Sequence, residues 1–198
     1  SNEFDTNEIF KLYTAKHTEV GVPYFVGQHG NAYGTHLDSF DWPELDTSDK
    51  FFTWGWDNET KNIVPAFAFN KSISDHKIKR DKDGVFLLVE NNLPQSYEPY
   101  DTSYEYICYQ SEQFSLIKAL ECHIRDKVLV RLSPHNSNES WNDVLRWKKE
   151  FPDIQLENGS ARFMSLVKKS RMVIFSFDTT GLLELLALNF PLIGFWRG

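Results

Sequence analysis

The sequence predicts an α/β fold built on a parallel β-sheet. From residue 85 onward, short β-branched and aromatic runs alternate with longer segments of helical periodicity, which is the pattern of repeated strand–helix units. The runs are almost continuously apolar, as expected of strands that are covered on both faces. Polar turns follow several of these runs, at the strand ends where open α/β sheets bind ligands.

The N-terminal part of the chain gives shorter and weaker signals. A helix is expected over residues 7–19, ended by Gly21 and Pro23. Short strands are expected over residues 24–26, 51–56 and 63–69. The charged stretch that follows, residues 71–84, predicts a solvated linker.

The C-terminal part alternates regularly between strands and helices. Strands are expected over residues 85–90, 127–132, 154–156, 172–175 and 192–196. Helices are expected over residues 103–125, 141–150, 161–169 and 182–188. The helix over 141–150 has Ser140 as its expected cap, and its expected inward face consists of Trp141, Val144, Leu145 and Trp147. Parallel strands joined in this way need crossovers, which are right-handed in nearly all proteins.

Length, charge and cysteine content limit the class of protein. At 198 residues the chain is long enough for one good-sized domain or somewhat more. A net charge of −7 and a pI near 5.4 argue against a nucleic-acid-binding surface, which needs a basic stripe. No apolar run approaches the ~18 residues of a membrane-spanning helix. Cys108 and Cys122 lack CxxC spacing, so a reduced, cytoplasmic protein is expected, although one disulfide stays open.

The most informative stretch, residues 171–196, predicts a strand, a turn, a helix and a further strand. The turn gathers four polar side chains and ends at Gly181; these are Ser176, Asp178, Thr179 and Thr180. Hydroxyls, backbone N–H groups and a helix N-terminus together suit a phosphate, and a glycine lets a ligand approach the backbone closely. The sequence therefore predicts a phosphate-binding site in this turn.

Glu184 is the charged residue of the helix that follows. Its neighbours are leucines, so the helix is expected to be buried on nearly every side, where a carboxylate without a partner is costly. Ribose hydroxyls are one partner that would satisfy it. In the alternative, Asp178 and Thr179 only cap the helix, and Glu184 binds an internal arginine or a backbone N–H.

Two further candidates lie at the end of another strand. Arg131 stands inside an apolar run, where a cation needs an anionic partner, and His135 follows in the next turn. Both are expected to contact the negative charge of a bound phosphate. An ion pair of Arg131 with Asp178 or Glu184 is the alternative.

His29 follows a predicted strand and stands between two nearby glycines. An exposed imidazole in such a place can act as a general base or donate a hydrogen bond to a phosphate, and a plain loop histidine is the alternative. Further along, His36, Asp38 and Asp41 supply zinc-type ligands, but their spacing from His29 fits no ligand signature. No metal site is predicted.

Several short motifs together carry a resemblance to a known group of enzymes. They are the QHG triplet at residues 28–30, the TWG element at 53–55, and the Ser/Thr turn with Glu184 and Pro191. As a set, from about residue 24 onward, they resemble surface-polysaccharide transferases with a GT-B-like fold, distantly similar to CDP-glycerol glycerophosphotransferases and Kdo transferases. The SPH turn at 133–135 resembles the His/Pro turn of these enzymes in reversed order, which leaves the exact role of His135 open.

The resemblance implies a Rossmann-like, nucleotide-binding C-terminal half of a GT-B fold over residues 76–198. Residues 1–75 would be the end of the N-terminal half and the crossing segment, and the chain would be a fragment of a longer protein. Phosphate binding falls to Arg131, His135 and the turn residues Ser176, Asp178, Thr179, Thr180 and Gly181, with Glu184 on the ribose. His29 would deprotonate the acceptor.

The implied function is transfer of a sugar or polyol phosphate from a nucleotide-activated donor to a surface-glycan acceptor. The resemblance implies no cofactor, no metal and no nucleic-acid partner, and it allows peripheral membrane association of the full-length protein. A nucleotide-sugar epimerase of the same fold and a non-catalytic binding module are the alternatives.

Overall fold

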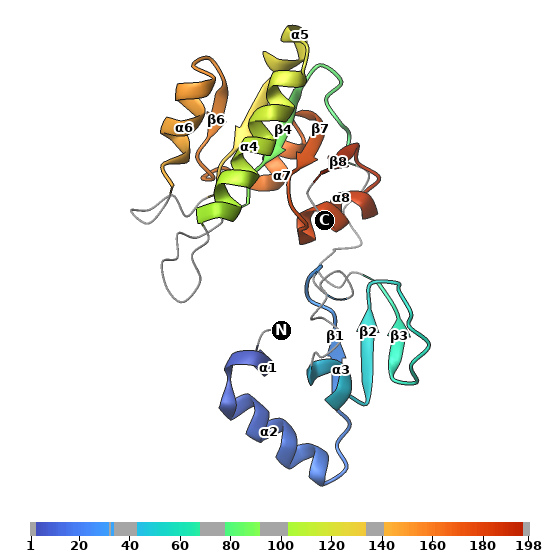
Figure 1. Cartoon of the computed structure of the whole chain (residues 1–198). Helices are drawn as coiled ribbons and strands as arrows, with labels where there is room; N and C mark the ends of the chain where they lie inside the picture. The colour runs from blue at the N-terminus through green and yellow to red at the C-terminus, as the bar shows by residue number, and fades with distance from the viewer. Residues whose placement is uncertain are drawn as a thin grey trace. The chain divides into compact units, whose positions relative to one another are not determined.

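In the computed structural model, the chain forms two compact units, Ser1–His76 and Lys77–Gly198. The structure describes residues 3–31, 33, 43–67, 78–91, 103–133 and 141–195. Each unit contains its own parallel sheet (Figure 1), so the predicted α/β class is confirmed. The division lies beside the boundary expected after residue 75, while the assignment of each unit to half of a GT-B fold stays a prediction.

The first unit has a three-stranded parallel sheet in the order β1-β2-β3. Its strands are β1 (Phe25–Gly27), β2 (Lys50–Thr53) and β3 (Ile63–Pro65), and its helices are α1 (Glu3–Thr6), α2 (Glu8–Glu19) and α3 (Pro43–Thr47). The core of this unit joins Val26 and Ile63 to the fully buried ring of Phe51. Both α1 and α3 are short and were not expected from the sequence.

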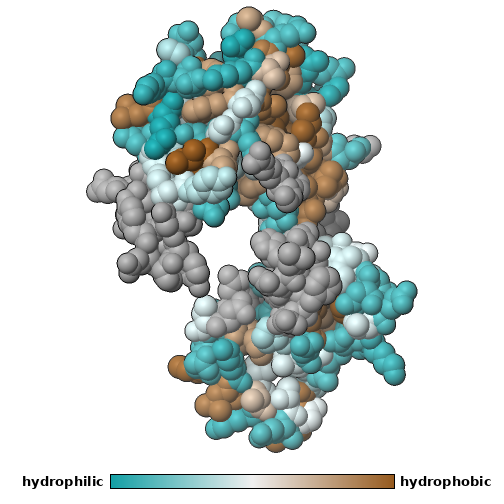
Figure 2. Space-filling view, viewed as in Figure 1, coloured by the Kyte–Doolittle hydropathy of each residue, from teal (hydrophilic) through white to brown (hydrophobic). Residues whose placement is uncertain are grey.

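Helix α2 confirms the predicted N-terminal helix. Its cap is Asn7, whose side chain accepts a hydrogen bond from the backbone N–H of Phe10 at 3.1 Å. None of its described residues is buried, and Ile9 and Leu12 are both strongly exposed. Figure 2 accordingly shows apolar atoms among hydrophilic ones on the visible face of this unit.

The second unit has a five-stranded parallel sheet in the order β6-β5-β4-β7-β8. Its strands are β4 (Val85–Val89), β5 (Val128–Arg131), β6 (Gln155–Glu157), β7 (Ser170–Phe175) and β8 (Leu192–Gly194). The chain adds β5 and β6 on one side of β4 and then returns to place β7 and β8 on the other side. The Rossmann-like architecture is therefore confirmed, and the strand order reverses between β4 and β7.

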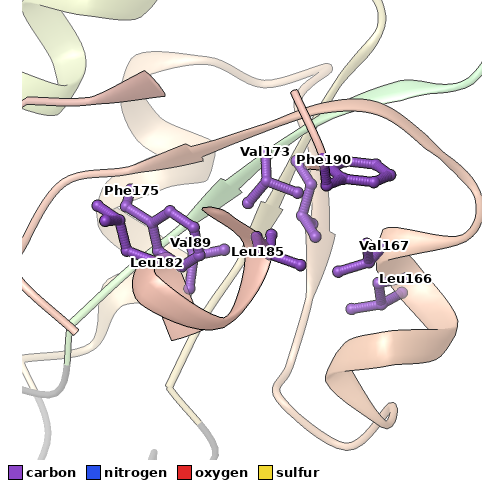
Figure 3. Close-up of a cluster of buried hydrophobic side chains, with 9 residues drawn as sticks. Val89, Leu166, Val167, Val173, Phe175, Leu182, Leu185 and Phe190 are labelled. Carbon is purple, nitrogen blue, oxygen red and sulfur yellow. The ribbon is translucent and has the colours of Figure 1, made fainter. Parts of the chain in front are cut away.

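Helices cover both faces of this sheet. They are α4 (Ser103–Ala119), α5 (Cys122–Arg125), α6 (Asp143–Glu150), α7 (Phe163–Val167) and α8 (Thr180–Ala187). On one face, side chains of α7 and α8 pack against Val89, Val173 and Phe175 (Figure 3). On the other face, Ile117 of α4 and Trp147 of α6 pack against alternate strand residues. Burial on both faces explains the nearly continuous apolar runs of the strands.

The helix expected over residues 103–125 is interrupted. Helix α4 ends at Ala119 and α5 begins at Cys122. Between them Glu121 is extended, with φ −60° and ψ 147°, and its carbonyl accepts from the N–H groups of Ile124 and Arg125. One extended residue thus starts a new turn, which a helical pattern in the sequence does not reveal.

The expected inward face of the helix over 141–150 is wrong in part. Trp147 is fully buried, but Leu145 is 64% exposed and Val144 is also exposed. Helix α6 starts at Asp143, after Asn142 in a left-handed conformation, and among its described residues Trp147 is the buried one. The indole fills this contact with Phe114 and Phe151, so the other apolar side chains stay at the surface. Ser140, the expected cap, lies outside the described residues.

Two chain-wide features complete the description. Cys108 and Cys122 are free thiols. Among the helices that the structure describes, none combines the length and the apolar character needed to cross a bilayer.

Candidate functional site

The point where the strand order reverses brings two turns together. Val89 of β4 pairs with Phe175 of β7, so Glu90 and Ser176 are the first residues beyond neighbouring strand ends. In open α/β sheets this crevice is where ligands bind. The structure therefore brings the predicted turn at residues 176–181 to the expected place beside residues 90–91.

A chain of hydrogen bonds fills the fork between these strand ends. The N–H of Asn91 donates to the Tyr109 hydroxyl at 2.7 Å, this hydroxyl lies 2.6 Å from Ser176 Oγ, and Ser176 Oγ donates to the Val89 carbonyl at 3.1 Å. Ser176 Oγ also lies 3.4 Å from Gln113 Oε1 of α4. Ser176 is buried, and its hydroxyl is held between α4 and the ends of β4 and β7.

Glu90 is a buried acid at the same edge. It is 8% exposed, and its Oε1 accepts a hydrogen bond from Trp147 Nε1 at 2.7 Å. Burial raises the pKa of Glu90 to about 8, against the hydrogen bond from Trp147, which favours the ionised form. Glu90 was not among the residues predicted from the sequence, although the sequence does show an acidic residue at the end of an otherwise apolar strand.

A second cluster joins α4 to the start of α6. The hydroxyl of Tyr106 donates to Asp143 and accepts from Gln110 Nε2 at 2.8 Å. Trp141 stacks on the Tyr106 ring with centroids 4.4 Å apart. Burial raises the pKa of Tyr106, and the hydrogen bond to Asp143 raises it further. Tyr106 therefore stays protonated and fixes α6, whose Trp147 holds Glu90.

The turn residues after Ser176 form the accessible part of the site. Helix α8 begins at Thr180, and Thr179 occupies its N-cap position in an extended conformation without a capping hydrogen bond from its side chain. Asp178 and Thr179 are half-buried, and neither side chain has a hydrogen-bond partner in the described parts of the chain. The side chain of Thr179 therefore does not cap the helix, as the alternative interpretation expected.

The environment of Glu184 differs from the expectation. On α8, Leu182 and Leu185 are buried, whereas Leu186 is 54% exposed and Glu184 itself is half-buried. The helix is therefore not enclosed on every side, because it covers the sheet with one face only (Figure 3). Burial alone does not force Glu184 to have a buried partner.

Arg131 has an anionic partner in the structure, but it is neither Asp178 nor Glu184, the partners of the alternative interpretation. Its Nε lies 3.6 Å from an Oε2 of Glu157, and its Nη2 donates to the Ala161 carbonyl at 3.5 Å. The guanidinium also lies over the ring of Phe163, 5.8 Å from its centroid. The alternative pair with Asp178 or Glu184 does not form; Arg131 is in register with Glu157 on the neighbouring strand β6 and pairs with it.

His135, the predicted phosphate contact, lies outside the described residues. So do His36, Asp38 and Asp41, which were considered as zinc-type ligands but not predicted to bind a metal. Within the ranges that the structure describes, no group of three or more His, Cys, Asp or Glu side chains could hold a metal ion.

His29 belongs to the first unit, where it follows β1. Its Nδ1 lies 2.7 Å from the Tyr33 hydroxyl, which donates to Glu44 Oε2 at 2.6 Å. Tyr33 and Glu44 are both buried, while the His29 side chain is 28% exposed. Tyr33 thus connects His29, the predicted base, to the buried carboxylate of Glu44.

The two motifs of the first unit meet at Gln28. Its Oε1 accepts from the backbone N–H of Trp54 at 2.9 Å and from Trp56 Nε1 at 2.8 Å, and its Nε2 donates to the Gly30 carbonyl at 2.7 Å. Gln28 is buried. The QHG triplet and the TWG element therefore form one structure, which fixes the backbone on both sides of His29.

Comparison with protein families matched the chain to the model described as LIC12162 family transferase, over residues 1–198. Comparison with curated proteins gave no match, and comparison with solved structures gave none. The family match covers the whole chain and agrees in reaction class with the transferase expected from the motifs. This protein therefore belongs to the LIC12162 family of transferases.

Proposed function

We propose that this transferase moves a sugar or a polyol phosphate from a nucleotide-activated donor to a surface-glycan acceptor, without a cofactor or a metal. One observation carries the proposal. The polar turn at residues 178–181 and the start of α8 lie directly beyond β7, where the strand order of the sheet reverses. Nucleotides bind at such points in Rossmann-like sheets because a helix N-terminus there faces the phosphates.

In this proposal the leaving nucleotide is stabilised by dipoles at the start of α8. The first turn of a helix presents backbone N–H groups that have no partner within the helix, and its dipole favours negative charge. The hydroxyls of Thr179 and Thr180 stand at this turn. Preorganised donors of this kind stabilise the charge that develops as the bond to the donor phosphate breaks.

The two acids of the site suit hydroxyl groups better than phosphates. A carboxylate accepts hydrogen bonds and repels a phosphate, so Asp178 and Glu184 fit the ribose or the transferred sugar. In the proposed arrangement Asp178 therefore binds a hydroxyl group, where the sequence predicted a phosphate contact. Both residues are half-buried. Asp178 lies just before α8, and Glu184 lies in the second turn of this helix.

Positive charge for the phosphate is proposed to come from Arg131 and His135. Both contacts of Arg131 are long, 3.6 Å to Glu157 and 3.5 Å to the Ala161 carbonyl. A phosphate oxygen would offer the guanidinium shorter, charge-assisted hydrogen bonds. A non-catalytic module closed by an Arg131–Glu184 pair is disfavoured, because Arg131 pairs with Glu157. The transferase family disfavours an epimerase.

The test is a thermal-shift screen of the full chain against CMP, CDP, UDP, GDP and their sugar conjugates. A ligand that binds only the folded state stabilises it by about 2.7 kcal/mol at one hundred times its Kd. We expect one nucleotide class to raise the midpoint by several degrees. Glu184→Ala should abolish this shift and leave the midpoint without nucleotide close to that of the wild type.

The matched control is Glu121→Ala, which removes an exposed glutamate of the same unit just before α5. It should leave the nucleotide shift unchanged. Absence of any shift in the screen would contradict a nucleotide-activated donor. An unfolded Glu184→Ala variant would instead assign Glu184 a structural role.

Gly181→Ala tests the packing of the same turn. A Cβ at Gly181 would meet Phe175 Cε1 at 3.5 Å, which is an ordinary contact, and alanine favours a helix by about 1 kcal/mol over glycine. We expect the midpoint without nucleotide to stay the same or rise, because the added methyl group packs against Phe175 and Phe163. A fall of the midpoint by several degrees would show that the turn does not tolerate a side chain at residue 181.

A further inference from the structure

The surroundings of His29 determine which ring nitrogen carries the proton. Tyr33 has one hydroxyl proton, and the hydroxyl donates it to Glu44 Oε2 at 2.6 Å. The same hydroxyl oxygen lies 2.7 Å from His29 Nδ1, so it can only accept in that contact. Nδ1 therefore carries a proton, and the neutral imidazole has its lone pair on Nε2.

Glu44 supplies a negative charge behind this contact. It is 2% exposed, and its Oε2 lies 3.9 Å from His29 Nδ1. Burial and this charge raise the pKa of Tyr24, another tyrosine of the same unit. A carboxylate at this distance stabilises an imidazolium, so it favours proton uptake by the ring.

The positions of the three residues are fixed by packing. The Tyr33 ring packs against the fully buried Phe51 with centroids 5.1 Å apart, and it meets the His29 ring edge-on at 5.3 Å. Gln28 holds the backbone before and after His29 through Trp54 and Gly30. The imidazole is thus oriented by its neighbours before any substrate binds.

We infer that Tyr33 and Glu44 are positioning residues that hold His29 with Nδ1 protonated, so that Nε2 takes the proton of the acceptor hydroxyl. The role as a base rests on the proposed function. In the step, the acceptor O–H bond breaks and its proton moves to Nε2. The acceptor oxygen bonds to the transferred group as the bond to the nucleotide phosphate breaks. The resulting imidazolium donates through Nδ1 to Tyr33, with Glu44 behind it.

The first test measures the tautomer and needs no substrate. Two-bond ¹H–¹⁵N spectra of the labelled full chain distinguish a proton on Nδ1 from one on Nε2, and the spectrum of His29→Gln identifies His29 among the 6 histidines. Above the titration of the ring, we expect Nδ1–H in the wild type. Tyr33→Phe should lower this population. Tyr24→Phe, which removes a hydroxyl of the same unit, should not.

Glu44→Gln is the second variant, in case Tyr33→Phe does not fold. Its side chain keeps the shape of glutamate, but its amide can donate to Tyr33, which then donates to Nδ1 and moves the histidine proton to Nε2. A wild-type His29 with its proton on Nε2 would overturn the inference. So would a tautomer population that neither variant changes.

The second test measures turnover with the nucleotide donor that the thermal-shift screen identifies. Tyr33→Phe is expected to lower kcat by about 10-fold or more, part of the 10²–10⁴-fold that a general base contributes, with nucleotide affinity unchanged. An unchanged kcat would overturn the positioning role. Failure of every nucleotide to bind would count against the proposed function alone, because the tautomer measurement does not depend on it.

Discussion

Replacing Trp147 by alanine is expected to lower the free energy of unfolding of the second unit by about 3–5 kcal/mol. The indole is fully buried and packs edge-on against Phe114, with centroids 4.8 Å apart, and against Phe151 at 5.8 Å. Truncation would leave a cavity between α4, α6 and the sheet, and it would remove the hydrogen bond to Glu90. Urea unfolding followed by far-UV circular dichroism measures the change.

The matched control is Leu145→Ala on the same helix. Leu145 is 64% exposed, so its truncation should change stability by no more than about 0.5 kcal/mol. Trp147→Phe is a second comparison, because it keeps most of the ring volume but loses the donor to Glu90. If Leu145→Ala cost as much as Trp147→Ala, the contact of α6 with the sheet would not depend on Trp147.

The stability of the second unit is expected to fall as the pH rises from about 5 to about 8. The pKa of Glu90 is raised from its ordinary value of 4.5 to about 8, mainly by burial. Between these values the folded state binds more protons than the unfolded state, so the free energy of unfolding decreases by roughly 1 kcal/mol per pH unit. The contribution is present at low pH and is lost as the pH approaches the pKa of the folded state.

Glu90→Gln should remove this dependence. The amide keeps an oxygen that accepts from Trp147 Nε1 but cannot ionise. Urea unfolding at pH 5, 6, 7 and 8 should show a shallower decline for the variant than for the wild type and greater stability of the variant at pH 8. Parallel curves for the two proteins would show that Glu90 does not titrate in this range.

The strands could be predicted from the sequence because their composition reports burial on both faces. Residues 85–89 and 172–175 are apolar throughout, and each face packs against helices. The α8 turn could also be placed, since it directly follows a strand. The order of the strands was not expected in detail, because it depends on which strands pair and not on any local pattern.

Partners between distant residues were not predictable. Arg131 meets Glu157, which lies on the neighbouring strand β6, and Glu90, just after β4, meets Trp147, which lies four elements further along on α6. His29 was a candidate because of its position after a strand, whereas its contacts with Tyr33 and Glu44 could not be expected, since only the folded unit joins them. Such contacts follow from tertiary packing, which composition and periodicity do not encode.

A nucleotide site at the reversal of the strand order can be tested by amide hydrogen exchange. The full chain is compared with and without a saturating concentration of the nucleotide that gives the largest thermal shift. We expect slower exchange in peptides that cover residues 176–184, together with residues 90–91. Protection confined to other parts of the chain, with these residues unchanged, would contradict the proposed site.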